Sequence, residues 1–184
     1  MSGRRPSERA YSRLPVLATR RHELETCVYC PKLCRTSCAV SNSEPRETLT
    51  PWGKMSSAYF MARGDVEIDG DFAKTAWACT ACGACEDFCH HHNPVAATLY
   101  EARAALFEKG LAIDEAKRIA DDFPAWNAEL AQRTSSLNAT LGAPADQANV
   151  VLFAGCTHCD TAVGDALFVV QQLLCEPVTL ATTC

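Results

Sequence analysis

Apolar residues at helical spacing dominate the first two thirds of the chain. The stretch between residues 38 and 79 carries helix signals and no strand pattern. Together with residues that start and stop helices, this spacing predicts helices over residues 15–25, 51–63, 71–77, 94–109 and 114–122. The pattern therefore indicates a mainly α-helical protein.

The second of these helices has the clearest ends. Thr50 is a good N-cap residue, Pro51 suits the first helical turn, and Gly64 is a typical stop. Asp71 is predicted to cap the following short helix, and Gly110 to end the alanine-rich helix after it. These signals predict a well-defined helix over residues 51–63.

The pattern changes near residue 150, where an apolar run predicts a strand. An amphipathic helix over 161–174 and a second strand over 177–182 complete a β–α–β unit. Two strands do not close a core by themselves, so we expect only the incomplete start of a small α/β domain here. The predicted parts are a disordered basic arm over 1–14, a helical domain over 15–134, a linker over 135–149 and the α/β start over 150–184.

Charge is spread unevenly along the chain, whose formal net charge is −5. Residues 1–22 contain six arginines and one acid, which leaves 11 basic and 21 acidic residues in the remainder. An acidic body argues against nucleic acid as a partner, because phosphate binding needs basic residues on the contact face. We interpret the arginine-rich start as a solvated terminus.

Twelve cysteines are a high number for 184 residues. We find neither a secretory signal nor an apolar run that could span a bilayer, so we expect a cytoplasmic protein that reaches a membrane only through a partner. In a reducing compartment, clustered cysteines are more often metal ligands or redox groups than disulfides. Their spacing therefore has to decide their role.

Eight of the cysteines form two four-cysteine runs. The second run has the spacing C-x₂-C-x₂-C-x₃-C followed by Pro94, and the first has one more residue before its third cysteine. In two-cluster iron–sulfur proteins the fourth cysteine of such a run binds the other cluster. We therefore predict two 4Fe–4S clusters with crossed ligation, one held by Cys27, Cys30, Cys34 and Cys89 and the other by Cys79, Cys82, Cys85 and Cys38.

Two other interpretations stay open. Eight thiolates could bind two zinc ions in a structural or binding module, although zinc sites usually show separated C-x₂-C pairs. Cys156 and Cys159 follow a predicted strand and open a helix, which is also the layout of a thiol–disulfide oxidoreductase.

Residues beside the runs have candidate roles of their own. The three histidines at 90–92 could bind a metal, or one of them could donate a hydrogen bond to a cluster sulfur. We interpret Trp52, Trp77 and Phe88 as core residues near the runs.

The two runs, together with Glu47-Thr-Leu-Thr-Pro51-Trp-Gly53 between them, resemble the iron–sulfur subunits of heterodisulfide reductase type. This group includes the iron–sulfur subunits of glycolate oxidase and of anaerobic glycerol-3-phosphate dehydrogenase. The resemblance implies an α-helical ferredoxin followed by a cysteine-rich domain with a CCG signature. Gly155-Cys156 is similar to the start of such a domain, and Cys184 stands where its CCG would begin, so Cys156 and Cys184 are additional candidate ligands.

The expected function is electron transfer within an oxidoreductase complex. The resemblance implies a flavin-containing dehydrogenase as the partner that supplies electrons, and a quinone, a disulfide or another carrier as the acceptor. It also allows a membrane subunit or a subunit with CCG domains. The sequence shows no nucleotide-binding glycine loop and no acid–base or nucleophilic catalytic layout, so any enzymatic role is that of an iron–sulfur subunit.

Overall fold

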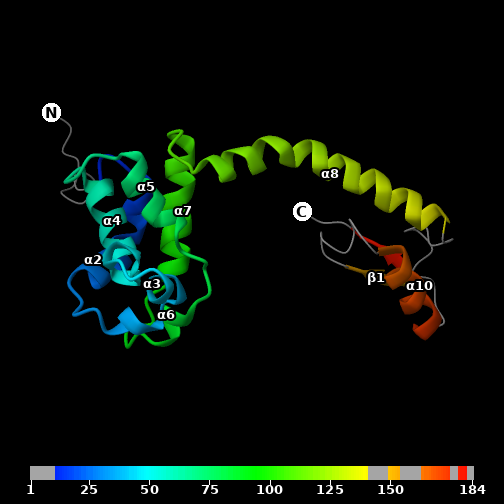
Figure 1. Cartoon of the computed structure of the whole chain (residues 1–184), viewed down its shortest axis with the longest axis horizontal. Helices are drawn as coiled ribbons and strands as arrows, with labels where there is room; N and C mark the ends of the chain where they lie inside the picture. The colour runs from blue at the N-terminus through cyan, green and yellow to red at the C-terminus, as the bar shows by residue number, and fades with distance from the viewer. Residues whose placement is uncertain (1–10, 141–148, 154–162, 175–177, 182–184) are drawn as a thin grey trace. The chain divides into compact units, whose positions relative to one another are not determined.

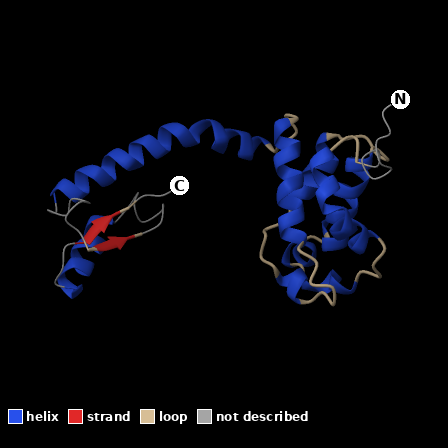
Figure 2. Cartoon of the chain, turned by 180° about the vertical axis from the view of Figure 1, so that it is seen from behind, coloured by secondary structure: helices blue, strands red, loops and turns tan. Residues whose placement is uncertain are grey.

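The computed structural model describes residues 11–140, 149–153, 163–174 and 178–181. The chain divides into two compact units, residues 1–116 and 117–184. Helices make up most of the described residues, which confirms the mainly α prediction (Figures 1 and 2). No helix in the described ranges is both long enough and apolar enough to cross a bilayer.

The first unit is built from short helical elements around two longer helices. In chain order they are η1 (Pro15–Arg20), α2 (Arg21–Val28), η2 (Leu33–Ser37), α3 (Ala39–Ser43), η3 (Glu47–Leu49), α4 (Pro51–Arg63), α5 (Gly70–Trp77), α6 (Ala84–Asp87) and α7 (Val95–Glu108). Helix α8 (Asp114–Thr140) follows. The end of the bundle that carries α3 and α6 is formed largely by loops (Figure 1).

Helix α4 is the centre of the first unit. It contacts α2, α5 and α7, and ten of its 13 residues are buried. Its ends are those that the sequence predicts: the Thr50 side chain accepts a hydrogen bond from the Gly53 N–H, and Gly64 closes the helix with a φ of 81°. A helix buried on nearly every side fixes the elements around it.

The core around α4 combines side chains that are far apart in the sequence. Leu24 of α2, Met55 of α4 and Leu99 of α7 are fully buried together. Tyr11 and Leu14 also belong to this core, so the predicted disordered arm over 1–14 is wrong for residues 11–14. Burying each large apolar side chain contributes about 1.5–3 kcal/mol, which explains why this short preceding segment is held in place.

Three predicted helix limits also need correction. The first helix begins as a 3₁₀ helix and continues as α2 to Val28. Asp69, and not Asp71, caps α5 by accepting a hydrogen bond from the Phe72 N–H at 2.8 Å. Helix α8 continues through Pro124 to Thr140, into the predicted linker over 135–149. Trp126, Leu130 and Leu137, which follow Pro124 in α8, pack in the core of the second unit, and this packing favours continuation of the helix past the proline.

The second unit confirms the predicted β–α–β pattern within its described residues. Strands β1 (Val150–Leu152) and β2 (Val178–Leu180) pair in parallel, and α10 (Val163–Leu174) lies between them in the sequence. Leu130 and Leu137 of α8 pack against this sheet. The side-chain amide of Asn138 accepts a hydrogen bond from the Leu180 N–H at 2.9 Å and donates one to the Leu180 C=O at 3.0 Å. It thereby extends the edge of β2.

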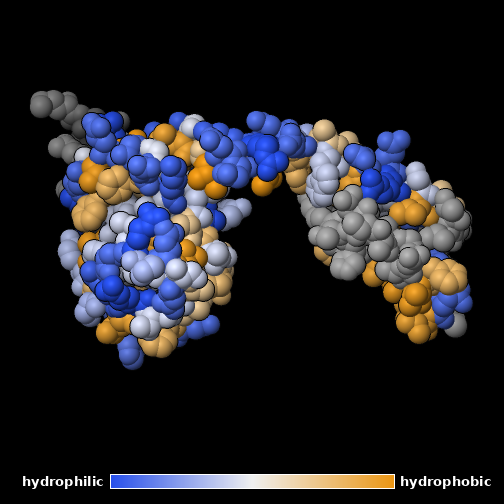
Figure 3. Space-filling view, in the orientation of Figure 1, coloured by the Kyte–Doolittle hydropathy of each residue, from blue (hydrophilic) through white to orange (hydrophobic). Residues whose placement is uncertain are grey.

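Helix α10 carries apolar side chains on the surface. Phe168, Val169 and Leu173 are at least half exposed, and orange side chains gather over this helix in Figure 3. The candidate ligands Cys156 and Cys184 and the alternative redox partner Cys159 lie outside the described residues. The structure therefore describes the α/β frame of this unit and not its cysteines.

Gly53 provides a test of how closely α4 is packed. A Cβ atom at Gly53 would overlap the Glu47 carbonyl oxygen and lie 2.8 Å from the Thr48 Cα, whereas one at Gly70 would meet nothing within 4 Å. We expect Gly53→Ala to destabilise the protein by about 1–3 kcal/mol through this clash. The thermal midpoint of anaerobically purified protein should fall by several degrees, at about 2–4 °C per kcal/mol for a chain of this length.

Gly70→Ala is the matched control, because it adds the same methyl group to a helix without a clash. Its thermal midpoint should stay level or rise slightly. Equal midpoints for the two variants would contradict the close approach of α4 to η3.

Candidate metal centre

The structure brings all eight cysteines of the two runs to the loop-rich end of the first unit. They lie in α2, in the loop after α2, in η2, directly before α3, in the loops before and after α6, and in α6 itself. All eight are free thiols in this structure. Two separate cavities open among them.

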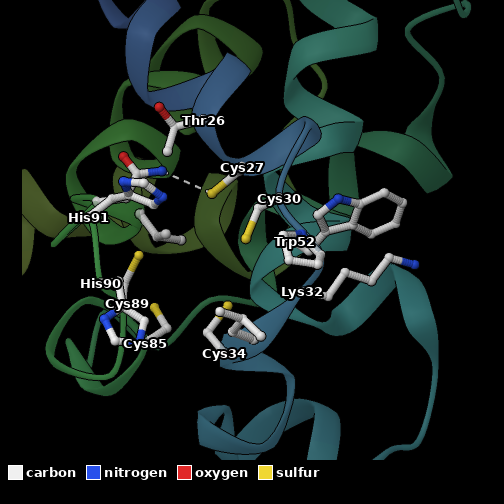
Figure 4. Close-up of a pocket in the computed structure, with 14 residues that line it drawn as sticks. Thr26, Cys27, Cys30, Lys32, Cys34, Trp52, Cys85, Cys89, His90 and His91 are labelled. Atoms are coloured by element: carbon white, nitrogen blue, oxygen red, sulfur yellow. Dashed lines mark hydrogen bonds between the residues drawn. The ribbon is translucent and has the colours of Figure 1, made fainter.

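The first cavity has a volume of about 300 Å³. Its cysteines are Cys27, Cys30, Cys34, Cys85 and Cys89. Figure 4 shows these side chains around the hollow, with Trp52 and Lys32 on one side and His90 and His91 on the other. Three thiols of the first run therefore share this cavity with the last two cysteines of the second.

The second cavity is narrower, with a volume of about 20 Å³. It is lined by Cys79, Cys82 and Cys85 of the second run and by Cys38 of the first. Such a volume holds about one water molecule, so a larger group at this site requires its lining residues to move apart. Cys85 and Val95 line both cavities, which makes the two sites neighbours.

The cysteine loops turn through left-handed backbone conformations. Gly83 has a φ of 77°, as expected for the glycine between two ligand positions, and Ala81 has a φ of 58°. Lys32 and His92 adopt similar angles at 67° and 47°. For residues with a Cβ this costs on the order of 1–3 kcal/mol each, a strain typical of functional loops.

The fourth cysteines of the two runs lie differently with respect to the helices that follow them. Cys38 directly precedes α3 and is its N-cap residue. Cys89 lies in the turn after α6, six residues before α7 begins. The loop that follows Cys89 carries Asn93 and Pro94 into the unit.

Burial makes three of these thiols difficult to ionise. It raises the pKa of Cys27 and of Cys85 to about 12, and it also raises the pKa of Cys34. Metal ligation requires thiolates, so a bound cation or cationic cluster has to supply the stabilising charge and displace the protons. Without a bound metal, these buried thiols are difficult to convert to thiolates, whereas a metal group would stabilise the thiolate form.

The pKa of Cys38 is shifted in the opposite direction to these three. Burial acts to raise its pKa, but hydrogen bonds from the backbone and hydroxyl of Ser41, the charge of Lys54 and the Val40 N–H together lower it. The Lys54 ammonium lies 3.5 Å from Cys38 Sγ, and Lys54 is only 2% exposed. The N-terminus of α4, with its partial positive charge, begins at the same place. This environment favours negative charge in the second cavity.

Asn93 is the buried side chain that contacts a cysteine sulfur at the first cavity, as Lys54 does at the second. Its side-chain nitrogen donates to Cys27 Sγ at 2.9 Å (dashed in Figure 4) and to the Glu23 carbonyl at 2.8 Å. Asn93 is 4% exposed. An N–H donor on a ligand sulfur orients the thiolate and withdraws charge from it. No sequence pattern signals this role, because it depends on a contact across 66 residues.

The aromatic residues near the runs have different roles. Trp52 lines the first cavity, and its Nε1 donates to the Val28 carbonyl at 3.3 Å. Phe88 is 58% exposed, so its interpretation as a core residue is wrong. Its place in the short turn after α6 leaves no layer of the bundle to cover it. Trp77 is half-buried beneath Arg103.

Arg103 of α7 anchors the start of the second run. Its guanidinium donates to the Ala76 carbonyl at 2.9 Å and to the Cys79 carbonyl, and it lies 5.7 Å from the Trp77 ring. These contacts join the end of α5 to α7 at the point where the ligand loop begins. Sequence reasoning missed Arg103, because nothing in the local pattern marks it.

The first cavity suits a cluster better than a single ion. It measures about 300 Å³ and is lined by five thiols, so it leaves room for a multi-atom group, whereas the second cavity, at about 20 Å³, has four thiols around a much smaller space. A tetrahedral zinc ion needs its sulfurs about 2.3 Å from the metal. Within the described ranges, no three His, Cys, Asp or Glu side chains are grouped closely enough to hold one metal ion.

Comparison with known proteins supports this chemistry. Residues 23–93 match the family model of the 4Fe–4S dicluster domain, a region that includes both cysteine runs. No curated protein and no solved structure matches the chain. The match supports an iron–sulfur-binding protein with an electron-transfer role.

The anchoring by Arg103 leads to a prediction. Arg103→Met should destabilise the protein by about 2 kcal/mol, because two backbone carbonyls lose a charged donor. Iron release to a chelator should also become faster, since the loop that starts at Cys79 is less restrained. Thermal unfolding and chelator-driven bleaching of the visible absorbance would measure the two effects.

Arg21→Met is the control. Arg21 is half exposed and pairs with Glu25 at 2.8 Å on the surface of α2, a contact that contributes little to stability because water screens it. If both variants unfold at one temperature and lose iron at one rate, Arg103 does not anchor the run.

Proposed function

We propose that this chain holds two 4Fe–4S clusters with crossed ligation and relays single electrons as a subunit of an oxidoreductase complex. The observation that carries the proposal is the lining of the two cavities, each of which combines thiols of one run with thiols of the other. The proposed ligand sets are Cys27, Cys30, Cys34 and Cys89, and Cys79, Cys82, Cys85 and Cys38.

Crossed ligation also explains why the two runs fold together. They are separated by 40 residues that form α3, η3, α4 and α5. A cluster with ligands from both runs would close that intervening segment into a loop, so that metal binding contributes free energy to folding. The clusters would then hold α4 in place in addition to its contacts in the core.

The arrangement of the cavities suits an electron relay. A bound 4Fe–4S cluster supplies one-electron chemistry, and its potential depends on hydrogen bonds to the sulfurs and on solvent exposure. Cys85 borders both cavities and therefore lies between the two groups. Cys82 is exposed whereas Cys27 is buried, so the second site lies nearer to a docked partner.

The partners follow from the resemblance to iron–sulfur subunits of heterodisulfide reductase type. In our proposal, a flavin-containing dehydrogenase donates electrons, and a quinone, a disulfide or another carrier accepts them. The α/β unit would be the start of the cysteine-rich domain, with its parallel β1–β2 pair as the supporting observation. The complex would be cytoplasmic, and any membrane association would come from a partner.

Metal analysis is the direct test of the cluster content. Protein purified without oxygen should contain about eight irons and eight acid-labile sulfides per chain, and should show broad visible absorbance. About two zinc ions and no sulfide would instead indicate a structural module and end the electron-transfer proposal.

Crossed ligation is tested by a pair of matched variants. Cys38→Ser should disturb the cluster held by the second run, and Cys89→Ser the one held by the first, each leaving about four irons per chain. Electron paramagnetic resonance of the reduced proteins should show complementary remaining signals. If both variants retain the cluster predicted to be lost, each run binds its own cluster and the crossing is wrong.

A further inference from the structure

Lys54 is a buried cation whose role the ligand sets do not explain. It is among the largest fully buried side chains of the described residues, at 2% exposed, and its Nζ lies 3.5 Å from Cys38 Sγ. We propose that Lys54 raises the reduction potential of the cluster in the second cavity above that of the first, so that electrons run from the first cavity to the second. This inference rests on the proposed function.

The surroundings of Lys54 give the proposal its physical basis. Among the described residues, no carboxylate forms an ion pair with Lys54, and Cys38 Sγ is the polar partner that its ammonium has. An unpaired buried ammonium is strongly unfavourable, so a compensating negative group is needed nearby. A cluster held by four thiolates is such a group. One more electron increases the negative charge, and the nearby cation stabilises that reduced state.

The first cavity has no equivalent charge among the described residues. Its buried donor is Asn93, a neutral amide at 2.9 Å from Cys27 Sγ. Lys32 does line this cavity, but it stacks on Trp52 at 3.8 Å and pairs with Glu47 at 3.0 Å while remaining about one third exposed. Its charge is offset by the carboxylate and screened by water. His90 and His91 also line the first cavity, but among the described lysines and arginines that line the two cavities Lys54 is the one that is buried and has no carboxylate partner.

The geometry of α4 explains how one helix serves the two sites differently. Trp52 lines the first cavity and Lys54 the second. Residues two apart on a helix point in nearly opposite directions, so the first turn of α4 stands between the cavities. Gly53 between them allows the contact with the Glu47 carbonyl that holds this turn in place.

The experiment is a redox titration of the full chain, purified without oxygen and followed by electron paramagnetic resonance. Cys89→Ser identifies which signal belongs to the first cavity. In the unaltered protein, the second-cavity cluster should be reduced first. Lys54→Met, which keeps the length but removes the charge, should disfavour reduction of that cluster at least tenfold, or about 59 mV for one electron. The first cluster should be unaffected.

Two further variants separate charge from structure. Lys54→Arg retains the cation and should keep the reduction potential of the second-cavity cluster within about 59 mV of its value in the unaltered protein. Lys74→Met removes an exposed lysine that pairs with Asp71 at 3.1 Å on α5 and lines neither cavity, and it should leave both potentials in place. Neither variant changes the solvent exposure of Cys82, so a change in the potential of the second-cavity cluster in Lys54→Met reports the charge of Lys54.

The proposal is overturned if Lys54→Met retains its iron and both potentials are unchanged, or if the first-cavity cluster of the unaltered protein is reduced first. Should Lys54→Met fail to assemble, the order of reduction in the unaltered protein and the Lys54→Arg titration decide the question. An unaltered chain without iron and sulfide would refute the proposed function itself, a result distinct from unchanged potentials.

Discussion

The burial of α4 between two sets of thiols is the constraint on which the first unit depends. Ten of its 13 residues are shielded from water, and its contacts with α2, α5 and α7 determine where those helices lie. Its first turn separates the two cavities, with Trp52 toward one and Lys54 toward the other. Without a single fixed position for this turn, neither set of cysteines would have a defined shape.

At the loop-rich end of the first unit, burial acts on thiols, which it keeps neutral, and on a lysine, whose charge it shields from water. It keeps Cys27 and Cys85 protonated, with pKa values of about 12, while it retains a lysine beside Cys38. A metal group that replaces protons and carries negative charge with its thiolates would relieve both conditions. In our proposal, the bound clusters therefore balance the charges of this site.

The sequence was most informative where local chemistry decides the structure. Thr50, Pro51 and Gly64 predict α4 to the residue, and the cysteine spacing predicts that thiols of both runs line common cavities. The helix that crosses Pro124 was predicted to end too early, because packing within the second unit outweighs the local penalty.

The residues around the thiols were beyond prediction. Lys54 resembles an ordinary surface lysine in the sequence, since lysines are almost never fully buried. Asn93 and Arg103 act on groups 66 and 24 residues away, a relation that only the folded chain reveals. Spacing within a segment can identify ligands, whereas the groups that tune them come from other segments.

The mixed lining of the cavities has a consequence for how the protein is made. If the first cluster takes Cys89 as its last ligand, the site begun at Cys27 stays incomplete while the ribosome adds the next 62 residues. At 5–20 residues per second this interval lasts about 3–12 s. During that time the early thiols are exposed to oxidants and stray metals, so correct maturation requires protection of the nascent chain and delivery of iron and sulfide after its emergence.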